Sequence, residues 1–196
     1  MGLYEDMDLT RGSAADNKKT VSGPDLRWRN DSTTAPAILI EAMRPNDLAE
    51  VLIIQQDGLS SLWSEASFAA EIEEPDASLY VARLMGVEKK CQVLGYICFW
   101  VVADEIQMAN LAVHIHYRRR GVGRQLVLYA LRTGYRAGAR LAVLEVSLAN
   151  AAAKALYEKL SFVPIHGRPF YYPESREAAL VLKLSLGRAW RHQQCG

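Results

Sequence analysis

Apolar residues follow two different periods along the chain, and these periods predict where strands and helices lie. Short apolar or alternating runs rich in Val, Ile and Leu are typical of strands, whereas apolar residues three and four positions apart are typical of amphipathic helices. We therefore expect strands at 37–43, 78–85, 91–103, 105–115, 141–147 and 178–186. We expect helices at 44–58, at 60–75, after Gly123 and at 150–160.

Residues that favour helix ends and turns agree with this division. Asn46 or Asp47 is placed to cap the first helix, and Ser64 is placed near the start of the second, which Pro75 ends. The three strands between residues 78 and 115 are separated only by GVEKK and by a turn at Asp104. Such short connections predict an antiparallel meander.

One domain accounts for most of the chain. Residues 1–36 show neither period and mix Gly, Ser, Asp, Asn, Lys and Thr, so we expect a flexible N-terminal extension. The chain has 196 residues, of which 50% are apolar, and this suits a single core of ordinary size. We place that domain at 37–186 and a short C-terminal tail at 187–196.

Charge and cysteine content narrow the classes of function. A net charge of +1 gives no overall attraction to nucleic acid or to an acidic membrane, so any anion site must be local. The apolar run at 93–103 is well below the roughly 18 residues of a membrane span, and no apolar segment near the start resembles a secretory signal. Three cysteines without a CxxC pair favour neither a disulfide framework nor a zinc site. We expect a cytoplasmic protein without a metal, without membrane binding and without direct nucleic-acid binding.

A glycine-rich loop follows the third strand of the meander and carries three consecutive arginines. The sequence RRRGVG at 118–123 lies between an expected strand and an expected helix. The first amides of a helix have no partner within it and favour anions, and glycines let a bulky phosphate approach the backbone. The loop lacks the Gly-Lys-Ser/Thr of a Walker loop and the third glycine of a dinucleotide fingerprint. From the residues alone it is either an anion site or a solvated charge run.

The spacing Arg118-x-x-Gly121-x-Gly123 resembles the Q/R-x-x-G-x-G/A motif of the GCN5-related N-acetyltransferases (GNAT). Three further stretches, NLAVHIHYRRRGVGRQLV, LEVSLANAAAKALYEKLSF and FYYPESREAALVLKL, are similar to the ribosomal-protein-alanine N-acetyltransferases of the RimI type. The similarity covers roughly residues 37 to 185. It implies an α/β fold with a central twisted mixed sheet of about six to seven strands, about four helices and a splayed strand pair for acetyl-CoA.

The resemblance also implies which residues hold acetyl-CoA. The backbone of Leu111, Ala112 and Val113 would pair with the pantetheine arm, and the loop would hold the diphosphate. Asn150 would contact the cofactor, although it is equally well placed as a helix N-cap. The loop residues implied are Arg118, Arg119, Arg120, Gly121, Val122, Gly123 and Arg124.

Two residues are implied in the chemistry. Glu145 matches the family's general base, and Tyr157 matches the tyrosine that protonates the leaving thiolate. From the sequence alone, Glu145 could instead face solvent by strand alternation, and Tyr157 could be core packing. An α-amine has a pKa of about 7.7–8.0, so a modest base is sufficient to deprotonate it.

The function implied is transfer of acetyl from acetyl-CoA to the N-terminal amine, expected to be alanine, of a small-subunit ribosomal protein, by a monomer or weak dimer. The alternatives are another amine (a protein lysine, a polyamine or an antibiotic) or a non-catalytic acyl-CoA-binding module. Tyr171, Tyr172 and Trp63 are candidates for acceptor contacts. Ser161 and Phe170 depart from the family pattern, at a helix exit and in the acceptor stretch. His114 and His116 are expected to be structural.

Overall fold

The computed structural model describes residues 38–56, 63–74, 76–84, 92–172 and 177–187, with the side chains of 166–177 excepted. The chain divides into two units, residues 1–34 and 35–196, and everything described lies in the second. The predicted extension at 1–36 and nearly all of the predicted tail lie outside the described residues. Both stay predictions.

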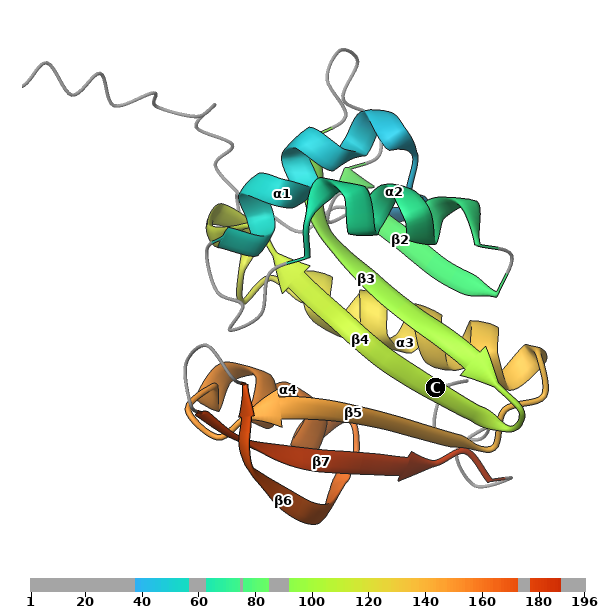
Figure 1. Cartoon of the computed structure of the whole chain (residues 1–196), viewed down its shortest axis with the longest axis vertical. Coiled ribbons are helices and arrows are strands. Elements are labelled where there is room, and N and C mark those ends of the chain that lie inside the picture. The colour runs from blue at the N-terminus through green and yellow to red at the C-terminus, as the bar shows by residue number, and fades with distance from the viewer. Residues whose placement is uncertain (1–37, 57–62, 75, 85–91, 173–176, 188–196) are drawn as a thin grey trace, which may run out of the picture. The chain divides into compact units, whose positions relative to one another are not determined.

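The described residues form seven strands, four α-helices and two short 3-10 turns (Figure 1). The elements are β1 (Ile38–Ala42), η1 (Pro45–Asp47), α1 (Leu48–Gln56), α2 (Glu65–Glu73), β2 (Ala77–Leu84), β3 (Val93–Val102), β4 (Glu105–Val113), η2 (Ile115–Tyr117), α3 (Val122–Arg136), β5 (Leu141–Ser147), α4 (Ala151–Lys159), β6 (Val163–Tyr172) and β7 (Glu177–Ser185).

All seven strands belong to one mixed sheet in the order β1-β2-β3-β4-β5-β7-β6. The strands from β1 to β4 pair antiparallel in succession, which confirms the predicted meander. β4 and β5 are parallel, and β5, β7 and β6 are again antiparallel. The predicted α/β fold with a mixed sheet is confirmed.

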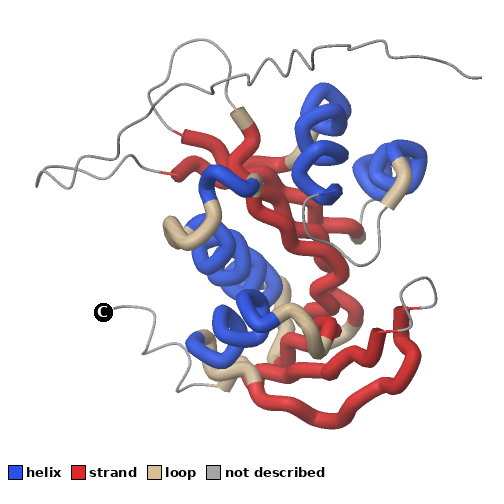
Figure 2. The backbone as a smooth tube through the Cα atoms, turned by 90° about the vertical axis from the view of Figure 1, so that its left-hand side faces the viewer, coloured by secondary structure: helices blue, strands red, loops and turns tan. Residues whose placement is uncertain are grey.

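Helices cover the two faces of the sheet unequally (Figure 2). On one face, α3 and α4 pack over a cluster that includes Leu126, Leu131, Leu144 and Tyr157. We call this the α3 face. On the other, α1 and α2 cover only the β2–β4 part, with a cluster that includes Phe68 and Tyr96. We call this the α1 face.

The residues at three helix ends, Ser64, Asp47 and Ser161, differ in how they satisfy the backbone. The Ser64 side chain caps α2 by accepting from Ser67 N at 3.0 Å. The carboxylate of Asp47, just before α1, accepts instead from Arg44 N at 3.0 Å and pairs with the buried Arg83. Ser161, after α4, is left-handed with φ 66°, so serine keeps the conformation that glycine usually supplies there. None of the helices in these described ranges is long and apolar enough to cross a bilayer.

One strand was missing from the predicted element order. β6 (Val163–Tyr172) is an edge strand whose pairing with β7 shifts register near Pro164 and again after Arg168. Proline cannot donate to a ladder and is tolerated on edge strands, and such interruptions remove the alternation that identifies a strand.

Candidate active site

The site is defined by the place where β4 and β5 separate. The two strands pair over four residues, from Glu105 opposite Leu141 to Met108 opposite Leu144. Beyond that point β4 stays paired with β3, and β5 stays paired with β7. Figure 1 shows the two strands diverging toward their C-terminal ends. Each strand therefore presents one edge to the space between them, and a strand edge can hydrogen-bond an extended ligand.

A β-bulge stands at the start of this separation. Phe99 pairs with Met108 and Cys98 with Asn110, so Ala109 is an extra residue on β4. The bulge lies just before Leu111, Ala112 and Val113, the residues expected to pair with the pantetheine arm, and these three residues lie in the separated part of β4. Bulges bend a strand and increase its twist, which is how one edge leaves its neighbour.

The glycine loop lies at the C-terminal end of β4 and begins α3. Gly121 is the N-cap with φ 84°, a conformation that favours glycine. The first intrahelical bond runs from Gln125 N to Gly121 O at 3.0 Å, so the amides of residues 122–124 precede the hydrogen-bonded ladder. These amides and the positive end of the helix dipole form an anion-binding arrangement.

The four arginines of this loop have different roles in the structure. Arg118 donates from Nε to Val113 O at 3.0 Å and so ties the loop to the end of β4. The guanidinium of Arg120 lies 5.7 Å from the centre of the Tyr117 ring. Arg119 is left-handed with φ 62°, and its side chain is exposed, as is that of Arg124.

Gly123 marks where the loop, β4 and α4 converge. A Cβ at this position would stand 3.5 Å from Leu156 Cδ2 on α4 and 3.5 Å from Val113 Cγ2 on β4. A larger side chain would extend into the contact between these elements. The helix amides thus lie beside the separated end of β4, which suits a ligand that has both a diphosphate and an extended arm.

Glu145 is the first residue of β5 beyond its pairing with β4. Ala142, Leu144 and Val146 are buried on the α3 face, so alternation places Glu145 on the α1 face, where it is half-buried. The alternative in which alternation turns Glu145 to solvent is met only in part, because the side chain is half-buried. The carboxylate therefore borders the separation from the side opposite to α3 and α4.

Tyr157 lies on α4 and belongs to the cluster on the α3 face. It is 6% exposed and packs edge-on against Phe162, with ring centroids 5.5 Å apart. Its membership of the core confirms the packing role considered for it. This packing contact is made by the ring of Tyr157.

Asn150 caps α4 through its side chain, with Oδ1 accepting from Ala153 N at 3.0 Å. The N-cap role is confirmed, and a cofactor contact through the amide nitrogen stays a prediction. His114 likewise has a local role, because its Nδ1 accepts from His116 N at 3.3 Å. Groups of three or more His, Cys, Asp or Glu residues able to hold a metal are absent from the described ranges.

The acceptor candidates are only partly visible. Trp63 packs against Phe68 and Trp100, with ring centroids 5.2 and 6.0 Å apart. The side-chain amide of Gln55 holds the backbone of Trp63, with Gln55 Nε2 donating to Trp63 O at 2.6 Å. The side chains at 170–172, with the Phe170 departure and the two tyrosines, lie outside the described residues.

Sequence reasoning missed two features beside the separation. A Cβ at Gly95 on β3 would lie 2.7 Å from Ala112 O, so only glycine lets β3 approach β4 there. A glycine inside a strand was the signal. Asn110 is 6% exposed, and Tyr96 donates to its Oδ1 at 3.3 Å. A polar residue in an apolar strand was the signal here.

Cys98 is buried in the same region of the α1 face. Burial raises the pKa of its thiol, with a smaller contribution from the charge of Glu71. Because the thiolate is the nucleophilic form, this cysteine is unsuited to forming an acyl-enzyme.

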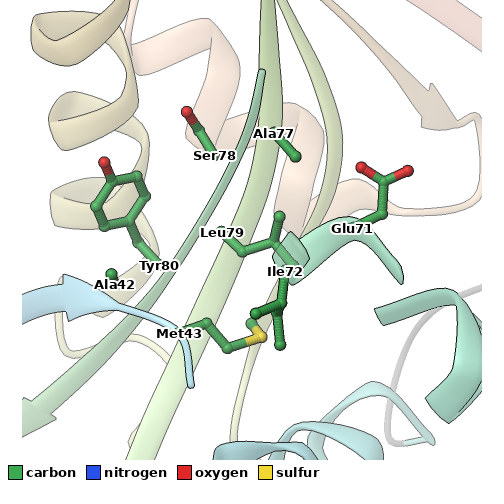
Figure 3. Close-up of a pocket in the computed structure, with 8 residues that line it drawn as sticks. All are labelled: Ala42, Met43, Glu71, Ile72, Ala77, Ser78, Leu79 and Tyr80. Atoms are coloured by element: carbon green, nitrogen blue, oxygen red, sulfur yellow. The ribbon is translucent and has the colours of Figure 1, made fainter. Parts of the chain in front are cut away.

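A separate pocket lies away from the separated strands, between the end of β1, the start of β2 and α2 (Figure 3). Its one charged side chain, Glu71, accepts from Trp100 Nε1 at 3.0 Å. None of the candidate cofactor or catalytic residues lines it. The lining residues are Ala42, Met43, Glu71, Ile72, Ala77, Ser78, Leu79 and Tyr80.

Comparison with known proteins gives a consistent match. The model of the acetyltransferase (GNAT) family matches residues 48–162. The ribosomal protein bS18-alanine N-acetyltransferase of Escherichia coli is 31% identical over 149 residues, which are 75% of this chain and 97% of that protein.

Solved structures show the same fold. The ribosomal-protein-S18-alanine N-acetyltransferase from Escherichia coli superposes with a TM-score of 0.66 at 29% identity, covering 77% of this chain and 95% of that one. Arabidopsis thaliana NAA60 in complex with acetyl-CoA superposes with a TM-score of 0.70 at 16% identity, covering 76% and 99%. At that identity the second match shows the fold alone.

Proposed function

The chain belongs to the acetyltransferase (GNAT) family, and on that premise we propose that it acetylates the N-terminal amine of a small-subunit ribosomal protein, with alanine as the first residue. As a member of the family the chain is an acetyltransferase. The similarity to ribosomal-protein-alanine N-acetyltransferases, which spans nearly their whole length, supports the choice of acceptor.

The observation that carries the proposal is the meeting of a free strand edge and a helix N-terminus at one point. The separated part of β4 ends beside the amides of residues 122–124. A Cβ built on Gly123 would lie 3.5 Å from Val113 Cγ2. A strand edge binds an amide-containing arm, and a helix N-terminus binds a diphosphate. Acetyl-CoA has both groups, and when bound it supplies the thioester.

We assign the base role to Glu145. It borders the separation on the α1 face, where α1 and α2 cover only the β2–β4 part of the sheet. An α-amine needs little help to lose its proton near neutral pH, so a carboxylate acting directly or through one water is sufficient. A lysine amine, with a pKa of about 10.4, would need far more.

We assign the acid role to Tyr157, a buried residue of α4 that belongs to the cluster on the α3 face. The acceptor nitrogen forms a bond to the thioester carbon as the carbon–sulfur bond breaks. The amine proton passes to Glu145, and the sulfur takes a proton from the Tyr157 hydroxyl. The raised pKa of Cys98 favours this direct transfer over an acyl-enzyme.

The test uses the full chain, acetyl-CoA and a synthetic peptide that begins with alanine and contains one internal lysine. We expect free thiol to appear together with one acetyl group on the α-amine, located by mass spectrometry. The same peptide with a blocked N-terminus is the control. Acetylation of the blocked peptide would favour a lysine acetyltransferase, and cofactor binding without turnover would favour a non-catalytic module.

Two near-isosteric variants test the assigned roles. Glu145→Gln and Tyr157→Phe keep size and packing while removing the base and the acid. We expect each to lower kcat by about 10²–10⁴ with little change in acetyl-CoA affinity, as is typical of general acid–base groups. Full activity in either variant would contradict its role.

A further inference from the structure

The bulge at Ala109 changes which β4 side chains reach the α1 face. Ile106 and Met108 pack on the α3 face. After the extra residue, the side chains at even-numbered positions of β4 point to the other face of the sheet. Ala112 accordingly packs on the α1 face with Tyr96 and Cys98. Asn110, which pairs with Cys98, therefore lies on the α1 face.

Asn110 lies on β4 and Glu145 lies on β5, so one residue stands on each side of the gap between the two strands. The last paired residues, Met108 and Leu144, both face α3. The next residue on β5 is Glu145, and the next on β4, once the bulged residue is passed, is Asn110. Because side chains alternate along a strand, both lie on the α1 face. Apart from the bulged Ala109, they are the first side chains on that face beyond the point where the strands part.

The hydrogen bond of Asn110 fixes which end of its amide is available. The Tyr96 hydroxyl donates to Oδ1 at 3.3 Å. With Oδ1 held on the Tyr96 side, the Nδ2 group, which has two N–H donors, is directed away from Tyr96.

The chemistry of the acceptor says what such a donor could recognise. In a protein N-terminus the α-amine and the first peptide carbonyl are separated only by Cα, so the two groups fit a base and a donor on neighbouring strands. A lysine ε-amine has no carbonyl at that distance. The cofactor loop lies at the end of β4 beside α3, whereas Asn110 faces the side from which we expect the acceptor.

We propose that Asn110 is a specificity-determining residue, whose side-chain N–H donates to the first carbonyl oxygen of the acceptor and so positions the α-amine beside Glu145. This inference rests on the proposed function. It assigns the selection of α-amines over ε-amines to a neutral donor at the bulge.

The experiment pairs one protein change with one substrate change. The substrate is the alanine-initiated peptide in which a trans-alkene replaces the first peptide bond, which removes the carbonyl oxygen. The protein variant is Asn110→Leu, which removes the donor at similar size. We expect the wild type to lose about tenfold in kcat/KM on the alkene substrate, the usual effect of one hydrogen bond.

The expected result is non-additive. For Asn110→Leu we expect kcat/KM on the normal peptide to fall about tenfold. We expect no further fall in kcat/KM on the alkene peptide, and unchanged acetyl-CoA affinity. Losses that multiply, or no loss on the normal peptide, would overturn the inference while leaving the proposed function intact. A wild type that acetylates no N-terminus overturns both.

Two controls keep the result interpretable. An alkene at the second peptide bond should cost each protein equally. Gln92→Leu removes a similar tyrosine–amide hydrogen bond, since Tyr117 donates to Gln92 Oε1 at 2.9 Å. This variant should keep the wild-type discrimination, which is the ratio of kcat/KM on the normal peptide to kcat/KM on the alkene peptide. If Asn110→Leu does not fold, Asn110→Asp retains the oxygen that Tyr96 needs while removing the N–H donors. It should show the same loss of discrimination, and discrimination kept in that variant would overturn the inference.

Discussion

At the scale of single residues, Ser161 shows a conformational cost that the chain tolerates. Its φ of 66° lies in the left-handed region, which costs a residue with a Cβ roughly 1–2 kcal/mol. We expect Ser161→Gly to raise the free energy of unfolding by about 1 kcal/mol, after part of the gain is lost to chain entropy. Urea unfolding measures this. Ser161→Ala keeps the Cβ and should give no gain, so equal stabilisation by both variants would contradict the explanation.

Cys98 makes stability depend on pH in a defined direction. Burial raises its pKa above the ordinary value of about 8.5, so the folded thiol keeps its proton where the unfolded one loses it. The unfolded state then binds fewer protons, and the free energy of unfolding falls by about 1.4 kcal/mol per pH unit above that value. The stability is fully present below about pH 8.5 and is lost as pH rises.

Unfolding measured between pH 7 and 9.5 tests this. Cys98→Ala should be less stable at pH 7, because a buried side chain is shortened, but its stability should fall less steeply with pH. Tyr96 is buried beside it and should add a further fall only above about pH 10. An equal slope in both proteins would contradict the assignment to Cys98.

At the scale of elements, the contact between α3 and β4 depends on Gly134. A Cβ there would overlap the side chain of Ile106, which is fully buried and cannot move into solvent. Alanine normally stabilises a helix relative to glycine by about 1 kcal/mol. Here we expect Gly134→Ala to destabilise by about 1–3 kcal/mol through overpacking. Thermal unfolding measures it, and a stabilised variant would contradict the close approach.

A double variant provides the control. Ile106→Ala removes both side-chain atoms that lie nearest to the added Cβ, Cγ1 and Cδ1, so it should cost less in the Gly134→Ala background than in the wild type. That favourable coupling is the sign of a relieved clash.

Most elements could be predicted from the sequence, because their burial follows one period. The strand at 141–147 and the capped helix after Ser64 are examples. β6 could not, because its prolines break the alternation. The bulge also could not, since residues 106, 108, 110 and 112 are all buried and read as one face. The structure divides them between two faces, and that division places Asn110 on the same face as Glu145.

The candidate site was predicted less completely than the fold. The motif at 118–123 and the strand position of Glu145 could be found in the sequence, because spacing alone defines them. The roles of these residues come from the resemblance to the family. The structure gives the position and the contacts of each residue, and it does not test the roles. The tie from Arg118 to Val113 O could not be anticipated, because it depends on how the loop folds back on β4.

At the scale of the whole sheet, four residue pairs join the β1–β4 part to the β5–β7 part, with helices packed across one face. A ligand that pairs with the free edge of β4 and with the amides of α3 should therefore protect specific amides from exchange. At an acetyl-CoA concentration 100 times Kd, we expect exchange in residues 109–113 and 122–124 to slow by about a hundredfold. The β1–β2 pair, which is remote from the separation, should not change.

Hydrogen exchange followed by mass spectrometry resolves these segments, and a cofactor fragment separates the two contacts. Adenosine 3′-phosphate 5′-diphosphate has the diphosphate but no pantetheine arm, so it should protect 122–124 and leave 109–113 unchanged. Only the whole cofactor should protect the strand edge, because only the arm carries the amides that pair with it. Protection of 109–113 by the fragment, or of neither segment by acetyl-CoA, would mean that the separation of β4 from β5 serves another purpose.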